Sequence, residues 1–385
     1  MTLKETVNAI LHYRNYDRMP IVHFGFWFET LEKWYQEGHL TADEAHNWND
    51  GNYIDKQIDK KLGFDMNWYS CYSPVTNLFP AFERKVLETL PDGSKKVLDN
   101  NGAIVLEKDH AGSIPCEFDH LLKNRKSWEE HYLPRLQVTE DRITKSMVNT
   151  VEKPIPFDQG GLEYLQNENR PSHLGLFCGS LFGEIRNWLG LEGISYLYVD
   201  DEPLFDEITQ TVADISYNCT KSVLEKGAKF DFAHFWEDIC FKNGPLISPA
   251  VFERKIGPKY KKITELVNSY GIDIISVDCD GLIDSLIPTW FNNGVNTMFP
   301  IEVGTWDANI KPWREKFGKN LRGVGGMKKY VFAQDFAAID QEIERLKALV
   351  DLGGYIPCPD HRIAPDGKWD NVRYYCDKMR QTFGG

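Results

Sequence analysis

The chain has 385 residues, of which 42% are hydrophobic and 26% are charged, values that are ordinary for a globular protein with a large core. Its formal net charge of −13 argues against nucleic acid or an anionic membrane surface as the main partner, because both require basic patches. No apolar run reaches about 18 residues and the first residues have no apolar leader segment, so we expect a cytoplasmic protein without a transmembrane helix.

The eight cysteines are scattered along the chain without a CxxC pair, which excludes zinc fingers and thioredoxin-type sites. In a cytoplasmic protein they are expected to be free thiols, most of them small buried residues. Cys279 and Cys358 differ from the others because polar residues surround them near the ends of predicted strands.

Two strands are expected early in the chain, one in the apolar run that ends at His23 and Trp27 and one near residues 65–70. Residues 80–110 then read as strands of aliphatic and β-branched residues separated by two glycine-containing turn signals. Because this pattern is antiparallel, it predicts a β-meander inserted into the N-terminal half of the fold.

From residue 173 onward, short apolar runs alternate with longer amphipathic stretches such as residues 335–350, for which Asp335 is the expected N-cap. Alternation of strands and helices predicts a parallel sheet. No glycine-rich dinucleotide fingerprint follows the first strand. Together with the two early strands, eight strands are available, and the sequence therefore predicts an α/β fold, a single (β/α)8 TIM barrel over residues 1–385.

Barrel enzymes carry their functional side chains at the C-terminal ends of the strands, and polar and aromatic residues recur at these positions here. The predicted catalytic residues are Asp278, Asp280, Glu237 and His361. The predicted substrate-binding residues are His23, Phe26, Trp27, Cys178, Trp236, Lys328 and Arg362.

The end of one predicted strand carries the sequence Asp-Cys-Asp-Gly at residues 278–281. In a strand Asp278 and Asp280 point to the same side, where two carboxylates could bind a cation or form an acid–base pair with one raised pKa. The alternative is structural: Asp280 and Gly281 form a turn, and Asp278 caps the next helix.

Two other candidates also have a structural interpretation. His361 follows Asp360, so the imidazole is either a metal ligand oriented by its neighbour or one half of a hydrogen-bonded pair. Glu237 is either a carboxylate of the site or a helix cap.

Three segments, in this order, resemble the uroporphyrinogen decarboxylase superfamily: "NGPLISPAVFERKIGPKYKKI" at 243–263, the two strands within 271–303, and "GGYIPCPDHRIAPDGKWDNVRYY" at 353–375. The resemblance covers residues 170–385 well and the first half loosely, and it implies a (β/α)8 barrel. At the first strand, "HFGFWFE" replaces the arginine-rich segment of the true decarboxylases, which argues against a porphyrinogen substrate.

The chain is closest in kind to the corrinoid-dependent methyltransferases of this superfamily, similar to the methylcobalamin:coenzyme M enzymes and the O-demethylases. That branch holds zinc through His-x-Cys-Gly and a later Cys, and the matching positions here are Asp278, Asp280 and His361. The resemblance thus implies a divalent metal, zinc first, and the candidates to complete the ligand set are Glu237 and Glu302. Carboxylate ligands in place of thiolates favour a metal that acts as a Lewis acid on an ether or hydroxyl oxygen of the substrate.

The main hypothesis that follows is a methyltransferase that takes a methyl group from a methoxylated compound, with aromatic compounds among the candidates. The acceptor is a Co(I) corrinoid (cobalamin) carried by a partner, a corrinoid-binding protein. The first alternative is a decarboxylase or other lyase for a small acid, in which Asp278 handles the proton and Arg362 or Lys328 binds the carboxylate. The second alternative is a non-catalytic binding barrel. Barrels of this superfamily often form homodimers, although no stretch of this chain indicates one.

Overall fold

A computed structural model describes residues 1–108 and 116–384. Its main feature is a seven-stranded sheet in which every pair of neighbours is parallel. Across the sheet the order is β17 (Tyr355–Pro359), β16 (Arg322–Met327), β15 (Thr297–Ile301), β14 (Ile275–Asp278), β11 (Phe232–Trp236), β10 (Gly175–Phe177) and β3 (Cys71–Tyr72). All C-terminal strand ends therefore lie at one edge of the sheet, as the sequence predicted.

Two further strands, β1 (Val22–His23) and β2 (Met66–Asn67), pair in parallel beside this sheet. Only residues 68–70 separate β2 from β3, and β1 contacts β17, where a parallel bridge joins Phe26 to Ile363. The strands thus follow chain order around a TIM-barrel-like arrangement. Closure of the ring beyond this single bridge stays a prediction.

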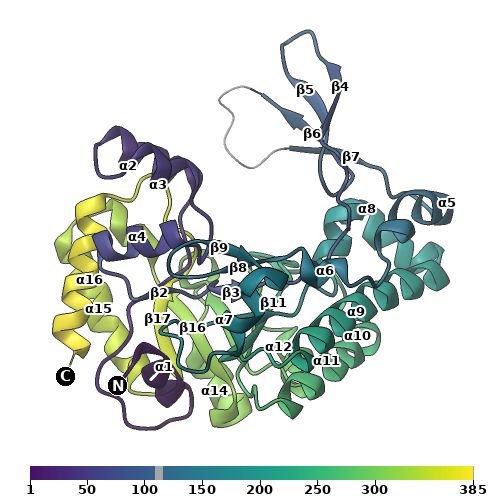
Figure 1. The fold of residues 1–385 in the computed structure, drawn as a ribbon. Coiled ribbons are helices and arrows are strands. Elements are labelled where there is room, and N and C mark those ends of the chain that lie inside the picture. The colour runs from purple at the N-terminus through teal and green to yellow at the C-terminus, as the bar shows by residue number, and fades with distance from the viewer. Residues whose placement is uncertain (109–115, 385) are drawn as a thin grey trace.

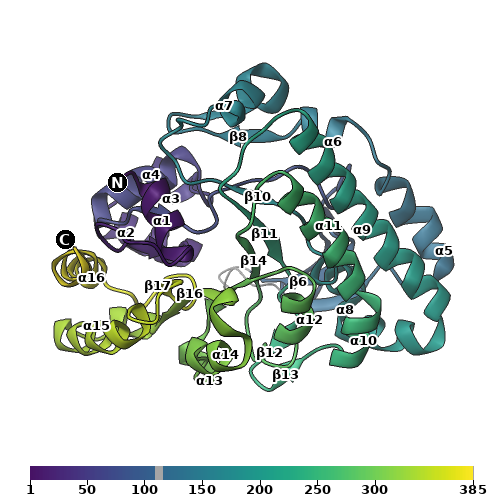
Figure 2. The ribbon, with the colours of Figure 1, turned by 90° about the horizontal axis from the view of Figure 1, so that it is seen from below.

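Apart from the short β2–β3 connection, helices connect the successive strands of the parallel arrangement and lie outside the sheet (Figure 2). On α15 (Phe336–Val350) the buried residues recur at helical spacing, and Asp335 accepts the Ala338 N–H as the predicted N-cap. The other helices are α1 (Leu3–Leu11), α2 (Phe28–Gln36), α3 (Ala42–His46), α4 (Tyr53–Leu62), α5 (Arg125–Ser127), α6 (Asp141–Thr144), α7 (Leu162–Gln166), α8 (Gly183–Asp200), α9 (Glu202–Glu225), α10 (Pro249–Lys255), α11 (Gly257–Ser269), α12 (Ile287–Asn292), α13 (Val303–Trp306), α14 (Ile310–Phe317) and α16 (Trp369–Phe383). Within the described residues, no helix has the length and apolar character needed to cross a membrane.

A four-stranded antiparallel sheet follows β3 and projects from the rest of the molecule as an arm (Figure 1). Its strands are β4 (Lys85–Thr89), β5 (Lys95–Leu98), β6 (Ala103–Glu107) and β7 (Cys116–His120). Two separate two-stranded sheets are formed by β8 and β9 (Met147–Asn149, Pro154–Pro156) and by β12 and β13 (Cys240–Phe241, Gly244–Pro245). The first three arm strands fall within the predicted meander over 80–110, whose last residues, 109 and 110, lie outside the described residues. The fourth strand was not predicted, because its sequence alternates charged and mixed residues without an aliphatic pattern.

Candidate functional site

Asp278 is the last residue of β14, where its backbone is in register with Trp236 of β11 and Phe299 of β15. Asp278 is buried, with 3% of its surface exposed. The Tyr69 hydroxyl donates a hydrogen bond to Oδ2, whereas Oδ1 has no hydrogen-bond partner among the described residues. Burial raises the pKa of Asp278 well above its ordinary value, and the negative charge of Asp280 raises it further. Asp278 therefore favours the protonated, neutral form.

Asp280 and His361 come together from the ends of β14 and β17. The Asp280 Oδ2 lies 3.2 Å from the His361 Nε2, and the His361 ring stacks beside Trp27 with 5.8 Å between ring centroids. Gly281 adopts φ +86°, so the turn of the structural interpretation is present as well. The next helix, α12, begins only at Ile287, so Asp278 does not cap it.

The residues predicted to hold zinc are only partly assembled. Glu302 accepts hydrogen bonds from the Gly281 N–H at 2.5 Å and the Thr305 hydroxyl at 2.9 Å, so both of its oxygens are engaged. Among the described residues, three ligand atoms lie within 4.8 Å of one another in one group, which is formed by His23, Asp55 and Asp59. The set Asp278, Asp280, His361 and Glu302 is not such a group, and only the contact between Asp280 and His361 fits a shared ligand position.

His23 is fully buried on β1 and faces α4 instead of the predicted substrate. Its Nε2 lies 2.8 Å from Asp59 Oδ1 and 3.9 Å from Asp55 Oδ1, and its Nδ1 accepts the Gly25 N–H at 3.0 Å. Since Nδ1 is an acceptor, the ring proton sits on Nε2, the atom that a cation would need. The cluster is therefore a close, buried contact between His23 and Asp59 with a second carboxylate beside it, and it joins β1 to α4.

A cavity of about 410 Å³ opens beside His361. Its lining residues are Phe26, Trp27, Phe28, Trp48, Asn49, Asp50, His361 and Arg362. Arg362 forms a bidentate pair with Asp50, at 3.1 and 2.7 Å, and its guanidinium lies over the Phe24, Trp48 and Tyr69 rings. The structure thus gathers four predicted residues, from β1 and β17, around one aromatic cavity.

The other predicted substrate-binding residues lie outside this lining. Cys178 is fully buried, its thiol lies near Thr220 of α9 on the outer side of the sheet, and burial raises its pKa to about 12. Trp236 is the half-buried last residue of β11. Lys328 follows β16, and its backbone N–H donates to Glu342 at 2.8 Å.

Glu237 occupies a helix cap. Its fully buried carboxylate accepts the backbone N–H groups of Leu181, Phe182 and Gly183 at 2.8, 2.9 and 2.7 Å, where α8 begins. The hydroxyls of Ser180 and Tyr260 also donate to it. A helix N-terminus leaves such amides unpaired, so this carboxylate satisfies them and complements the helix dipole. The geometry matches the capping interpretation of Glu237.

Glu184, in the first turn of α8, gives the fold a pH dependence. Its Oε2 has no hydrogen-bond partner within the described chain, and burial, with Glu237 beside it, raises its pKa to about 7. An acid with a raised pKa favours folding while protonated, and that contribution is lost as the pH rises through about 7.

Between pH 6 and 8 the wild type should lose about 1 kcal/mol of unfolding free energy through this carboxyl group. Glu184→Gln should not show this loss, because glutamine does not titrate. Urea unfolding across this range measures it, with Glu192→Gln on the same helix as the control. An unchanged pH dependence in Glu184→Gln would show that this carboxyl does not titrate there.

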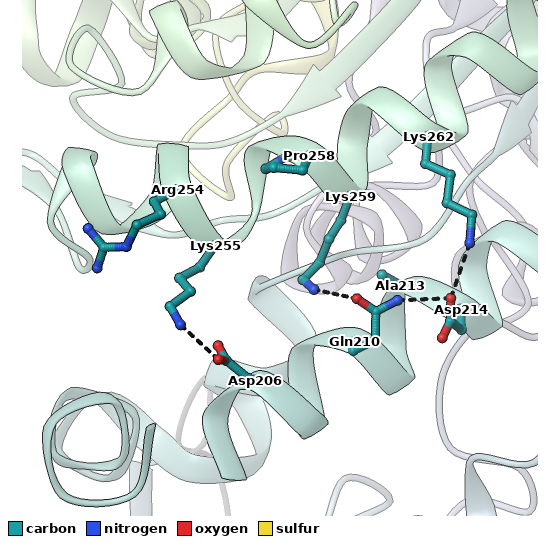
Figure 3. A pocket seen from close by; sticks show the side chains of 9 residues that line it. All are labelled: Asp206, Gln210, Ala213, Asp214, Arg254, Lys255, Pro258, Lys259 and Lys262. Atoms are coloured by element: carbon teal, nitrogen blue, oxygen red, sulfur yellow. Dashed lines mark hydrogen bonds and ion pairs between the residues drawn. The ribbon is translucent and has the colours of Figure 1, made fainter. Parts of the chain in front are cut away.

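A larger cavity, of about 470 Å³, lies between α9 and the helices α10 and α11 (Figure 3). Lys255 pairs with Asp206 at 2.7 Å, and Lys262 pairs with Asp214 at 3.4 Å. These charges join outer helices to one another, and none of the predicted site residues lines the cavity. The smaller cavity at the strand ends is the candidate site.

Several residues of the site were not predicted, among them Tyr69, Asp50 and Asn67. Tyr69 and Asn67 belong to the second predicted strand, which ends at the same edge of the sheet as the others. The expectation that functional side chains lie at the C-terminal ends of barrel strands could therefore have identified them. Asn67 donates to Asp50 at 2.8 Å and to Asp55 at 3.0 Å, and thereby links the cavity to the His23 cluster. Asp50 lies in the connection between α3 and α4, for which the sequence carries no signal.

Comparison with known proteins identifies relatives by structure only. No family model and no curated protein sequence matches the chain. A methyltransferase from Methanosarcina mazei matches with a TM-score of 0.62 and 14% sequence identity, covering 99% of each chain. A methionine synthase-like protein from Listeria monocytogenes covers 94% of this chain and 97% of its own at 13% identity, but its TM-score of 0.40 is too low to support an argument. The chain therefore shares its fold with a methyltransferase along nearly its entire length.

Proposed function

We propose that this protein is an enzyme that removes a methyl group from the oxygen of a methoxylated compound and delivers it to a corrinoid on a partner protein. The observation that carries the proposal is Asp278, a buried carboxyl that favours its protonated form and keeps one oxygen without a partner at the functional edge of the sheet. The fold shared with a methyltransferase supports the same reaction class.

Breaking a methyl–oxygen bond leaves the electron pair on the oxygen, which departs readily only if it gains a proton. Asp278 donates that proton, so that the product carries a hydroxyl group and Asp278 becomes a carboxylate. The positive charge of Arg362 favours this carboxylate, while Asp280 favours the acid before the reaction. A corrinoid held by the partner would supply the nucleophile that takes the methyl group.

The chain's own thiols near the strand ends are poorly suited to accept the methyl group. Cys279 and Cys358 are buried, and burial raises the pKa of each thiol well above its ordinary value. The thiolate is the nucleophilic form of cysteine, so neither side chain is activated. This observation fits an acceptor that comes from outside the chain.

The cavity beside His361 is suited to a flat, largely apolar substrate. Phe26, Trp27 and Trp48 supply aromatic walls, and its volume of about 410 Å³ falls in the range of small-molecule sites. In the decarboxylase alternative Arg362 or Lys328 binds the carboxylate of the acid. Both terminal nitrogens of Arg362 are already paired with Asp50, which argues against Arg362 in that role.

The proposal is tested by incubating the purified chain with Co(I) cobalamin and a panel of methoxylated aromatic and aliphatic compounds. We expect enzyme-dependent loss of the Co(I) absorbance together with formation of the hydroxylated product. Activity that survives a chelator fits proton donation by Asp278, whereas loss on chelation and recovery with zinc would favour the predicted metal. Release of carbon dioxide from a small acid, without methyl transfer from any compound, would contradict the proposal.

A further inference from the structure

The wall of the aromatic cavity beside His361 contains an ion pair. Among the described residues of its lining, Arg362 is the only one with a permanent positive charge and Asp50 is the only acidic one. Their side chains are 27% and 24% exposed, so the pair remains accessible to a bound molecule. A substituent of that molecule therefore meets two charges that already cancel each other.

The surrounding residues hold this pair in place. The two terminal nitrogens of Arg362 donate to the two carboxylate oxygens of Asp50, and Asn67 donates to Oδ1 of the same carboxylate at 2.8 Å. Gly25 leaves the space that the pair occupies, because a Cβ atom there would lie 2.7 Å from Asp50 Oδ1 and closer still to Arg362. The φ of Gly25, +88°, also favours glycine. The ion pair is thus part of the fold.

A carboxylate on a substrate has no free cationic partner in this wall. To pair with Arg362 it must displace Asp50, whose carboxylate would then lie beside it as a like charge. His361, which carries a positive charge only when protonated, already lies 3.2 Å from Asp280. A neutral aromatic ether can stack on the aromatic walls and leave the ion pair intact. The wall therefore discriminates by rejecting a charged ligand.

We propose that Asp50 is a specificity-determining residue: by holding Arg362, it makes the cavity select neutral methoxylated aromatic compounds over those that carry a carboxylate. This inference rests on the proposed function only in treating the selected molecules as substrates, since the preference itself is a binding property of the chain. Asp50→Asn keeps the shape of the side chain and its acceptor for Asn67 but leaves the charge of Arg362 uncompensated. A ligand carboxylate can then form the bidentate pair with Arg362.

The test compares the binding of anisole and para-methoxybenzoate, which differ by one carboxylate, by isothermal titration calorimetry of the chain without cobalamin. The wild type should bind anisole at least about 10-fold more tightly. In Asp50→Asn this ratio should fall roughly 10-fold or more, through tighter binding of para-methoxybenzoate. A ratio that Asp50→Asn leaves unchanged, or a wild type that binds neither ligand, overturns the proposal.

Two further variants separate the ion pair from the overall charge. Asp43→Asn removes the same charge from an exposed position on α3, where Asp43 accepts a hydrogen bond from Asn47 at 2.8 Å, and should leave the ratio unchanged. A change as large as that of Asp50→Asn would show that net charge sets the preference. Adding Arg362→Gln to Asp50→Asn should abolish the gain for para-methoxybenzoate, and a gain that persists contradicts the role of Arg362.

Binding and methyl transfer together distinguish this proposal from the proposed function. An Asp50-dependent preference for anisole, without methyl transfer to cobalamin from any compound, supports the assignment of Asp50 and contradicts the proposed function. Methyl transfer with equal kcat/KM for neutral and carboxylated compounds supports the proposed function and contradicts the assignment of Asp50.

Discussion

Methyl transfer by Asp278→Asn is expected to be roughly 10²–10⁴-fold slower than in the wild type, the range of effects typical of a general acid. Asparagine keeps the size of the side chain and can still accept the Tyr69 hydrogen bond, but it has no acidic proton for the leaving oxygen. The loss should appear in kcat, because the aromatic cavity that binds the substrate is unchanged. Stopped-flow absorbance of the cobalamin under saturating substrate measures it.

Asp273→Asn provides the matched control for this prediction. Asp273 precedes the same strand at its opposite end, where it is exposed and pairs with His12. Its replacement should leave kcat unchanged. Full activity of Asp278→Asn would contradict a catalytic role for Asp278. The candidate proton donors would then be Asp280 and His361, which lie 3.2 Å apart.

The largest loss of stability is expected for Glu237→Ala, which should lower the free energy of unfolding by about 3–5 kcal/mol. Five hydrogen-bond donors from α8 and its neighbours converge on this carboxylate, and alanine would leave most of them buried and unpaired. Urea unfolding followed by circular dichroism measures the effect. Glu225→Ala, at the exposed end of α9, should change stability by roughly 0.5 kcal/mol or less.

This measurement also separates the two interpretations of Glu237. A helix cap predicts a large loss of stability with a modest change in kcat for the folded variant. A catalytic acid predicts the reverse, so a stable but inactive Glu237→Ala would contradict the capping role and restore Glu237 to the catalytic set.

Local patterns were enough to predict many elements of the fold. The amphipathic spacing and N-cap of α15, the strand that ends on Asp278 and the first three strands of the arm are determined by neighbours in the sequence, so they could be predicted without tertiary information. The parallel order of the sheet followed from alternation alone. The fourth arm strand did not, because pairing with β6, and not its own composition, makes Cys116–His120 a strand.

The site depended on distances that no local pattern contains. The sequence by itself placed Asp278, Asp280 and His361 at the C-terminal ends of strands, because position along a strand can be predicted from local pattern. Only the folded chain decided that Tyr69, 209 positions earlier, donates to Asp278, that His23 and Cys178 face helices, and that Glu237 caps α8. The reason is physical: hydrogen-bond partners and the burial that raises a carboxyl pKa arise from packing between distant segments, which the order of residues does not reveal.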